Sequence, residues 1–298
     1  MARRARTTRQ DRSSPPAPTL PVGEVAVDTG TARVEPDPDH PRRLTLHVNG
    51  VPSSCLDLDD PGFLAFEYLQ QMAAVIDLLP AGPVRAVHLG AAGCALPRQV
   101  EHARPGSRQL GVDVDARLLE LVRTWFDLPR SPALRLRAGD AAAVLATLPP
   151  GRADVVVRDA FDGDTTPPHL TGTAFATACA TAVRPGGLVL ANCADRPPLS
   201  TVRQEAASFA AALGPDTVAE GRLAVLAEPG VLKGRRYGNV VLAGVTPTPA
   251  DGHDPSDDDR VDLRDTRLGR AMRSLAVPVT VLAGPELARF VGTARPLD

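Results

Sequence analysis

Hydrophobic and polar positions alternate in blocks along the middle of the chain. Short apolar runs of strand length occur at residues 84–89, 109–114, 134–137, 153–157 and 187–192. The segments between them carry apolar residues at helical spacing, at about 98–102, 116–126, 141–148 and 171–183. Strands that alternate with helices in this way pair in parallel through right-handed crossovers. The pattern therefore predicts an α/β domain built on a doubly wound sheet.

Two further strands follow the parallel series. A helix is predicted at about 200–213, then strands near 222–227 and 238–244. The short spacing between these strands favours a hairpin-like antiparallel end to the sheet. Five parallel strands with two more at one end fit a seven-stranded methyltransferase-type (Rossmann-like) sheet.

A small β region is predicted ahead of this sheet. The segment 43–48 alternates apolar and polar residues, Asn49-Gly50 is a strong hairpin signal, and residues 51–58 return as a second strand. Asp59-Asp60-Pro61 then resembles the start of a helix, with an acidic cap and proline in the first turn. Apolar residues at helical spacing continue it to Leu79.

The remaining segments complete the predicted organisation. An Arg/Pro-rich start has too few apolar residues to form a core, and a stretch rich in Asp and Pro after the last strand is typical of a linker. A helix at about 265–275 and a strand at 277–282 follow. We expect a disordered tail at 1–20, the small β region at 21–60, the main α/β domain at 61–245, an acidic linker at 246–260 and a C-terminal extension at 261–298.

Composition and charge exclude several classes of protein. The chain is 43% hydrophobic and 23% charged with a net charge of −2, as in ordinary soluble domains. The arginine-rich start lacks aromatic residues that would stack on bases, so nucleic-acid binding is disfavoured. No apolar run has the length of a membrane helix. No cysteine lies in a C-x-x-C pair and no phosphate-binding loop motif occurs, so we expect no metal and a cytoplasmic location.

Small residues follow the first predicted strand of the main sheet. Gly90, Ala91, Ala92 and Gly93 would let the backbone approach a ligand closely. The same run is also compatible with an ordinary tight turn between a strand and a helix. This loop indicates a ligand site only when it is considered together with the residues that follow the next strands.

Acidic residues lie at or just after the ends of the next three predicted strands. Asp113 lies at the spacing from Gly90 at which a carboxylate accepts hydrogen bonds from ribose hydroxyls. Asp140, with Ala141, follows the third strand and could accept from an adenine amine or cap the next helix. Asp159 and Asp162 follow the fourth strand. Because these residues share one sheet edge, together they predict an adenosyl-binding site and disfavour a nicotinamide cofactor.

These motifs in this order resemble the spermidine synthase (polyamine aminopropyltransferase) family. The resemblance runs from about residue 44 to 245, and its most informative part is Asp159-x-x-Asp162. It implies that Asp159 lies near the attacking amine and that Asp162 helps to hold the polyamine. A carboxylate suits both tasks, because an amine attacks only when neutral and a distal ammonium needs a counter-charge. By the same resemblance, Tyr68, Gln70 and Tyr237 would contact the substrate, and a homodimer is possible.

The chain also departs from the family pattern. The family's first loop carries an acid that contacts the donor's aminopropyl ammonium, and Gly93 stands in its place. The hairpin at Asn49-Gly50 lacks the family's glutamine. Aminopropyl transfer from decarboxylated S-adenosylmethionine to a polyamine is the first hypothesis. A methyltransferase that uses S-adenosylmethionine itself and a non-catalytic member of the fold are the alternatives.

Overall fold

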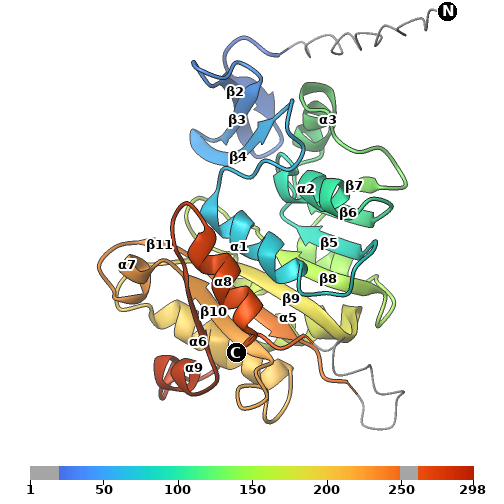
Figure 1. Cartoon of the computed structure of the whole chain (residues 1–298). Coiled ribbons are helices and arrows are strands. Elements are labelled where there is room, and N and C mark those ends of the chain that lie inside the picture. Colours follow the sequence, from blue (N-terminus) through green and yellow to red (C-terminus); the bar gives the residue numbers. More distant parts are fainter. Residues whose placement is uncertain (1–19, 249–260) are drawn as a thin grey trace, which may run out of the picture.

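Two β-sheets organise the computed structural model, which describes residues 20–248 and 261–298 (Figure 1). The smaller sheet is formed by the N-terminal residues and lies at one end of the molecule, above the larger sheet in Figure 1. Residues 1–19 of the predicted tail (1–20) and residues 249–260 of the predicted linker (246–260) lie outside the described residues.

The small sheet is a four-stranded antiparallel meander in the order β1-β2-β3-β4. Its strands are β1 (Val25–Val27), β2 (Gly30–Pro36), β3 (Arg43–Val48) and β4 (Val51–Asp57). Asn49 and Gly50 both have positive φ, as the tight turn between β3 and β4 requires. Leu44 and Leu46 alternate toward the buried face, which packs on the rest of the protein.

The large sheet has eight strands in the order β12-β10-β11-β9-β8-β5-β6-β7. The central strands from β9 to β7 are parallel, whereas β11 is antiparallel to both β9 and β10. Its strands are β5 (Arg85–Leu89), β6 (Arg108–Asp113), β7 (Leu134–Ala138), β8 (Ala153–Arg158), β9 (Val183–Asp195), β10 (Leu223–Ala227), β11 (Gly238–Val245) and β12 (Thr280–Ala283).

Helices cover both faces of the large sheet (Figure 1). The apolar core on one face joins the small sheet with α1 (Glu67–Ile76), α2 (Ala95–Ala103), α3 (Ala116–Trp125) and α8 (Thr266–Ser274). The core on the other face is formed with α4 (Ala141–Leu145), α5 (Gly172–Ala182), α6 (Ser200–Ala212), α7 (Pro229–Leu232) and α9 (Gly284–Val291). Strand residues alternate between the two cores: Leu188 and Leu190 face one, Val189 and Ala191 the other.

The predicted fold class is confirmed: the chain forms a doubly wound, methyltransferase-type sheet with a small N-terminal antiparallel sheet. The eighth strand is β12, which pairs antiparallel with β10 and joins the C-terminal residues to the main sheet.

The predicted helix start at Asp59-Asp60-Pro61 is wrong, because α1 begins only at Glu67. Asp60 instead accepts a hydrogen bond from the Gly62 N–H in a tight turn. The Arg98 guanidinium binds the backbone carbonyls of Asp57 and Asp60, which holds the segment in this turned conformation.

The strand order places a crevice next to β5. Chain connections run from β5 outward to β6 and β7, then return to β8 and β9 on the other side of β5. In open parallel sheets, ligands bind at such a switch point, beyond the carboxyl ends of the strands. The loops after β5 and β8 therefore border the crevice in which a ligand would bind.

Candidate active site

Gly90 brings the loop after β5 against the end of β8. Its φ is +90°, and a Cβ atom added there would lie 2.2 Å from the backbone oxygen of Asp159. Only glycine fits a position that combines this conformation with so close an approach. The loop can therefore lie beside Asp159 because residue 90 has no side chain.

Gly93 allows a second close approach, to the small sheet. A Cβ atom at Gly93 would lie 2.6 Å from the Ser54 Cβ and 2.7 Å from its Oγ. Ser54 is a buried residue of β4. The position where the family carries an acid is thus closed to any side chain by the N-terminal sheet. The neighbouring Ala92 and Cys94 take positive φ, so the loop turns sharply into α2.

Asp113 holds the same loop from the end of β6. Its carboxylate accepts hydrogen bonds from the backbone N–H of Ala92 at 3.0 Å and of Asp115 at 3.1 Å. Burial raises the pKa of Asp113, and these two N–H donors oppose that rise. A carboxylate oxygen has more than one acceptor position, so Asp113 retains the capacity to bind ribose hydroxyls.

Asp159 lies at the centre of a hydrogen-bonded trio. The Tyr68 hydroxyl, from α1, donates to its Oδ2 at 2.9 Å, and the Asn192 amide, from β9, donates to its Oδ1 at 3.0 Å. Both partners are buried, whereas Asp159 is partly exposed. Three elements far apart in sequence thus fix one carboxylate at the carboxyl edge of the sheet.

The surroundings of Asp159 alter its protonation. Burial raises the pKa of Asp159, and the hydrogen bonds from Asn192 and Tyr68 and the charge of Arg158 oppose that rise. Burial and the neighbouring carboxylate raise the pKa of Tyr68 well above 10.0, so its hydroxyl remains a donor. A carboxylate with a raised pKa is a better proton acceptor than an exposed one, which suits a general base.

Asp140 caps α4. Its Oδ1 accepts from the backbone N–H of Ala143 at 2.8 Å, and its Oδ2 lies 2.6 Å from the His169 Nε2. The Ala143 N–H and His169 both lower the pKa of Asp140. Ala141 is buried as the first residue of α4. The capping alternative is therefore observed, and a contact of Asp140 with adenine stays a prediction.

The other predicted substrate residues lie outside the trio. Asp162 is exposed in the loop after β8, where its backbone pairs with Thr165. The Gln70 side chain donates to the Leu64 carbonyl at 2.7 Å. Tyr237 is 44% exposed next to β11, and the Arg196 guanidinium lies 5.6 Å from the centre of its ring. Because β11 runs antiparallel to β9, Tyr237 lies at the same sheet edge as Asp159.

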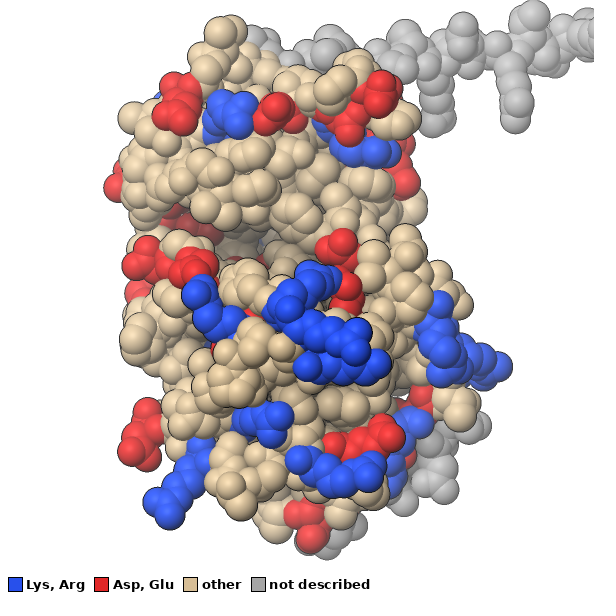
Figure 2. All heavy atoms as spheres, turned by 90° about the vertical axis from the view of Figure 1, so that its left-hand side faces the viewer, with Lys and Arg blue, Asp and Glu red and all other residues tan. Residues whose placement is uncertain are grey.

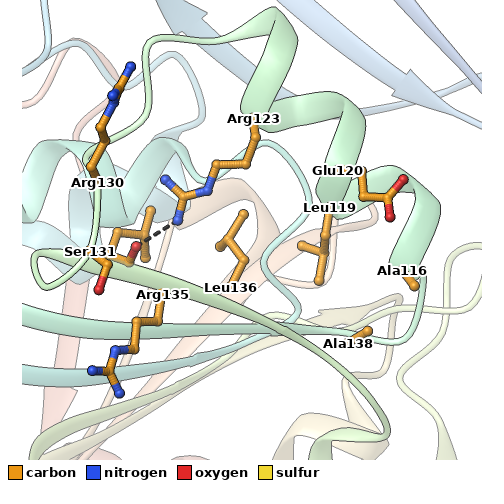
Figure 3. Close-up of a pocket in the computed structure, with 10 residues that line it drawn as sticks. Ala116, Leu119, Glu120, Arg123, Arg130, Ser131, Arg135, Leu136 and Ala138 are labelled. Carbon is orange, nitrogen blue, oxygen red and sulfur yellow. Dashed lines mark hydrogen bonds between the residues drawn. The ribbon is translucent and has the colours of Figure 1, made fainter.

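The surface of the described residues carries a hollow and a separate groove. A hollow opens below the N-terminal sheet in Figure 2, with acidic and basic side chains around it. A separate groove between α3 and β7 contains none of the predicted site residues (Figure 3). Among the described residues, no three metal-capable side chains form a cluster. No helix in 20–248 or 261–298 combines the length and apolar character needed to cross a membrane.

Sequence reasoning missed Asn192 and Ser54. Asn192 ends an apolar run in β9, and its place at the same edge as Asp159 was a usable signal. Ser54 gave no such signal, because its contact with Gly93 depends on how the small sheet packs on the large one.

The fold is a methyltransferase-type sheet, and the Asp159 carboxylate lies at its switch point. No protein-family model matches the chain. A probable spermidine synthase from Corynebacterium glutamicum, of solved structure, is 30% identical, with a TM-score of 0.80 over 93% of this chain and 96% of that one. On that evidence the chain belongs to the spermidine synthase family.

Other relatives agree with this assignment. The chain is 26% identical over 152 residues to the polyamine aminopropyltransferase of Neisseria meningitidis, and 27% identical over the same length to that of Chromobacterium violaceum. These matches cover 51% of this chain and 57% of each relative, so the chain matches little more than half the length of these curated relatives. A spermidine synthase from Thermotoga maritima shares the fold at 15% identity, with a TM-score of 0.55 over 93% of this chain and 84% of that one.

Proposed function

We propose that the chain is an aminopropyltransferase that moves an aminopropyl group from decarboxylated S-adenosylmethionine to a polyamine. The observation that carries this proposal is the Asp159 carboxylate, held by Tyr68 and Asn192 beside the Gly90 loop. The family and the curated aminopropyltransferase relatives favour this activity over methyl transfer. Another spermidine synthase of the same fold was solved with the transition-state analogue AdoDATO, which supports an adenosyl donor.

The donor would lie across the switch point. Asp113 is available for the ribose hydroxyls, and the backbone of Gly90 to Gly93 would line the sulfonium side. Asp140 stays the candidate for the adenine amine. Because the sulfonium is already an activated leaving group, the reaction needs no metal and no covalent enzyme intermediate; positioning and electrostatics are sufficient.

The chemical step assigns a task to each member of the trio. A neutral amine nitrogen attacks the donor carbon bonded to sulfur, a C–N bond forms, and the C–S bond breaks to release neutral methylthioadenosine. The amine's proton passes to Asp159 or to a water that Asp159 binds. Tyr68 and Asn192 hold the carboxylate in place, and Asp162 would attract the distal ammonium of the acceptor.

Product analysis tests this proposal. We expect purified protein, incubated with decarboxylated S-adenosylmethionine and putrescine, to yield spermidine and methylthioadenosine in equal amounts by mass spectrometry. S-Adenosylmethionine replaces the donor in the matched control. A methylated amine in the control, or no product with a panel of diamines and the first donor, contradicts the proposed function.

A further inference from the structure

A buried ion pair lies directly behind Asp159. Arg158 is the last residue of β8 and is 1% exposed, and Glu205, on α6, is also 1% exposed. The two Nη atoms of Arg158 meet the two carboxylate oxygens of Glu205 at 2.5 and 3.2 Å. This is a bidentate pair, which gives orientation as well as attraction.

Arg158 also ties together the segments that surround the site. Its Nη1 donates to the carbonyl of Leu170 at 2.9 Å, and its Nη2 donates to the carbonyl of Asn192 at 3.0 Å. The Cys193 Sγ lies 3.0 Å from the same Nη2. One guanidinium therefore connects the end of the loop after β8, the end of β9 and the middle of α6.

Stability alone does not account for such a pair. Removing two charges from water costs several kcal/mol for each ion, and packed apolar side chains of similar volume are often at least as stable. The Nε of Arg158 has no hydrogen-bond partner among the described residues. The arrangement is therefore costly, and it lies next to Asp159 and Asn192, two of the residues that the proposed chemistry uses.

Arg158 influences Asp159 in two ways, through its charge and through its contact with Asn192. The Arg158 charge opposes the rise that burial causes in the pKa of Asp159. Tyr68 from α1 and Asn192 from β9 are the other polar groups that contact the carboxylate. On the side of Arg158 away from Asp159, the charged partner of the guanidinium is Glu205 from α6. The Cys193 and Cys179 thiols also face Arg158, and burial raises the pKa of both.

We propose that Arg158 and Glu205 are positioning residues, which hold Asn192 against Asp159 and keep a fixed positive charge behind that carboxylate. Glu205 orients the guanidinium so that its charge and its N–H groups point to the end of β9. The inference deepens the proposed aminopropyl transfer and rests on it for its catalytic consequence. The placement of the Asp159 charge can be measured without turnover.

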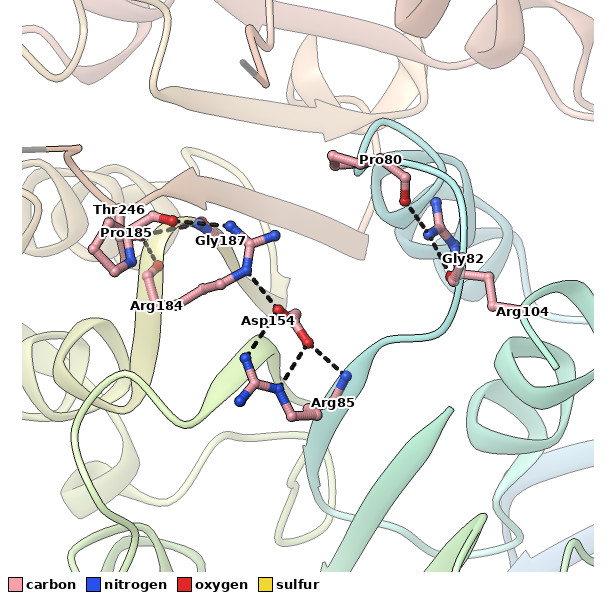
Figure 4. Close-up of polar contacts among 9 residues, drawn as sticks. All are labelled: Pro80, Gly82, Arg85, Arg104, Asp154, Arg184, Pro185, Gly187 and Thr246. Atoms are coloured by element: carbon pink, nitrogen blue, oxygen red, sulfur yellow. Dashed lines mark hydrogen bonds and ion pairs between the residues drawn. The ribbon is translucent and has the colours of Figure 1, made fainter. Parts of the chain in front are cut away.

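The same strand offers a matched control at its other end. Asp154, near the start of β8, binds the Arg85 backbone N–H at 2.7 Å and the Arg184 Nε at 2.5 Å (Figure 4). The Arg85 guanidinium also contacts both carboxylate oxygens of Asp154, so this cluster contains a partly buried bidentate pair on β8. It has no contact with Asp159, so its loss should affect stability and leave the site unchanged.

The decisive experiment is a carbon-13 NMR titration of the Asp159 carboxyl group, assigned with Asp159→Asn. In the double variant Arg158→Met/Glu205→Leu, we expect the pKa of Asp159 to rise, because the Arg158 charge that opposes the effect of burial is lost. In Asp154→Asn, it should stay at the wild-type value while the melting temperature falls. An unchanged titration in a folded double variant overturns the proposal.

Kinetics separate this inference from the proposed function. If wild-type protein turns over, the acid limb of the kcat profile should move to higher pH in the double variant, because Asp159 must be ionised to accept a proton. The donor KM should stay near its wild-type value. Arg158→Lys should keep the limb near its wild-type pH but lower kcat, since the charge remains and the bidentate geometry is lost. Absence of wild-type turnover contradicts aminopropyl transfer, and the NMR titration still decides the role of the pair.

Discussion

At the scale of single residues, the site depends on one carboxylate that is largely but not fully removed from water. Asp159 is held by a phenol and an amide, and burial raises its pKa. Such a carboxylate is a good proton acceptor but costs stability when it is ionised. The proposed function therefore favours an ionisable carboxylate at position 159, whereas stability favours a neutral side chain.

Replacing the carboxylate should reveal this cost. Burial raises the pKa of Asp159 in the folded protein above the ordinary value of 3.8, so the free energy of unfolding falls as pH rises through the folded pKa and the carboxyl group ionises. We expect Asp159→Asn to melt at the same or a higher temperature than wild type at pH 8. The difference should shrink as pH falls toward 3.8, which thermal unfolding across pH will measure. A clear loss of stability at pH 8 would contradict this account of the site.

Gly90 should be intolerant of any side chain. Gly90→Ala places a Cβ at a φ of +90° and 2.2 Å from the Asp159 oxygen, so we expect a loss of more than about 2 kcal/mol in the free energy of unfolding. Gly163→Ala is the control, because its φ is +63° and nothing lies within 4 Å of the added atom. Denaturant unfolding of both variants checks this; equal losses would show that the close approach is unimportant.

The residue scale also shows how far sequence reasoning reached. Asp113 and Asp159 were predicted as site residues because acids at the ends of successive parallel strands must share an edge, and Tyr68 was predicted from the family resemblance; their roles stay predictions. Asn192 was missed because a neutral amide ending an apolar strand carries no charge signal. The burial of Arg158 was unexpected, since a charged residue at a strand end is ordinarily exposed.

At the scale of elements, the small sheet is coupled to the donor loop. Asp115 caps α3 by accepting from the Leu118 N–H at 2.7 Å, and its other oxygen accepts from the Thr29 N–H and hydroxyl. The backbone N–H of Asp115 in turn donates to Asp113. The turn between β1 and β2 is thus connected through Asp115 to the predicted ribose acid.

Breaking this connection should weaken both stability and donor binding. For Asp115→Ala we expect a loss of about 1–3 kcal/mol in the free energy of unfolding, because a helix cap and two further donors lose their partner. Calorimetry with the donor should show weaker binding. Thr29→Val is the control, since it removes the hydroxyl and leaves the cap in place. Wild-type affinity in Asp115→Ala would contradict the coupling.

A buried histidine in β5 should make the fold sensitive to acid. Burial lowers the pKa of His88 to about 4, and its Nε2 lies 2.9 Å from the Gln109 Oε1. Since the folded pKa is below 6.5, stability is lost as pH falls from 6.5 through 4. The loss from this group is about 3 kcal/mol, at about 1.4 kcal/mol for each pKa unit. Denaturant unfolding of His88→Gln should lack this part of the acid loss; an identical pH dependence would contradict it.

Element boundaries were harder to predict than element types. The alternation of apolar runs and helical segments predicted the strands and helices of the central sheet in the right order. The start of α1 was misplaced because Arg98, far along the chain, takes the carbonyls of the preceding turn. A tertiary contact of this kind leaves no trace in local periodicity.

At the scale of the whole molecule, strand order creates the site. Strands are added to one side of β5 first and then to its other side, and the loops after β5 and β8 meet where the Gly90 backbone lies against Asp159. The parallel pattern predicted this crevice. The packing of the N-terminal sheet against Gly93 could not be predicted, because it depends on contacts between two separate sheets.

The most direct test of the account is a single-turnover measurement with the donor already bound. Wild-type protein and Asp159→Asn would be mixed with putrescine, and spermidine formation would be followed in time, with donor affinity measured separately. We predict that Asp159→Asn binds decarboxylated S-adenosylmethionine as wild type does but transfers the aminopropyl group about 100- to 10,000-fold more slowly. Equal transfer rates in the two proteins would contradict the assignment of Asp159 as the proton acceptor.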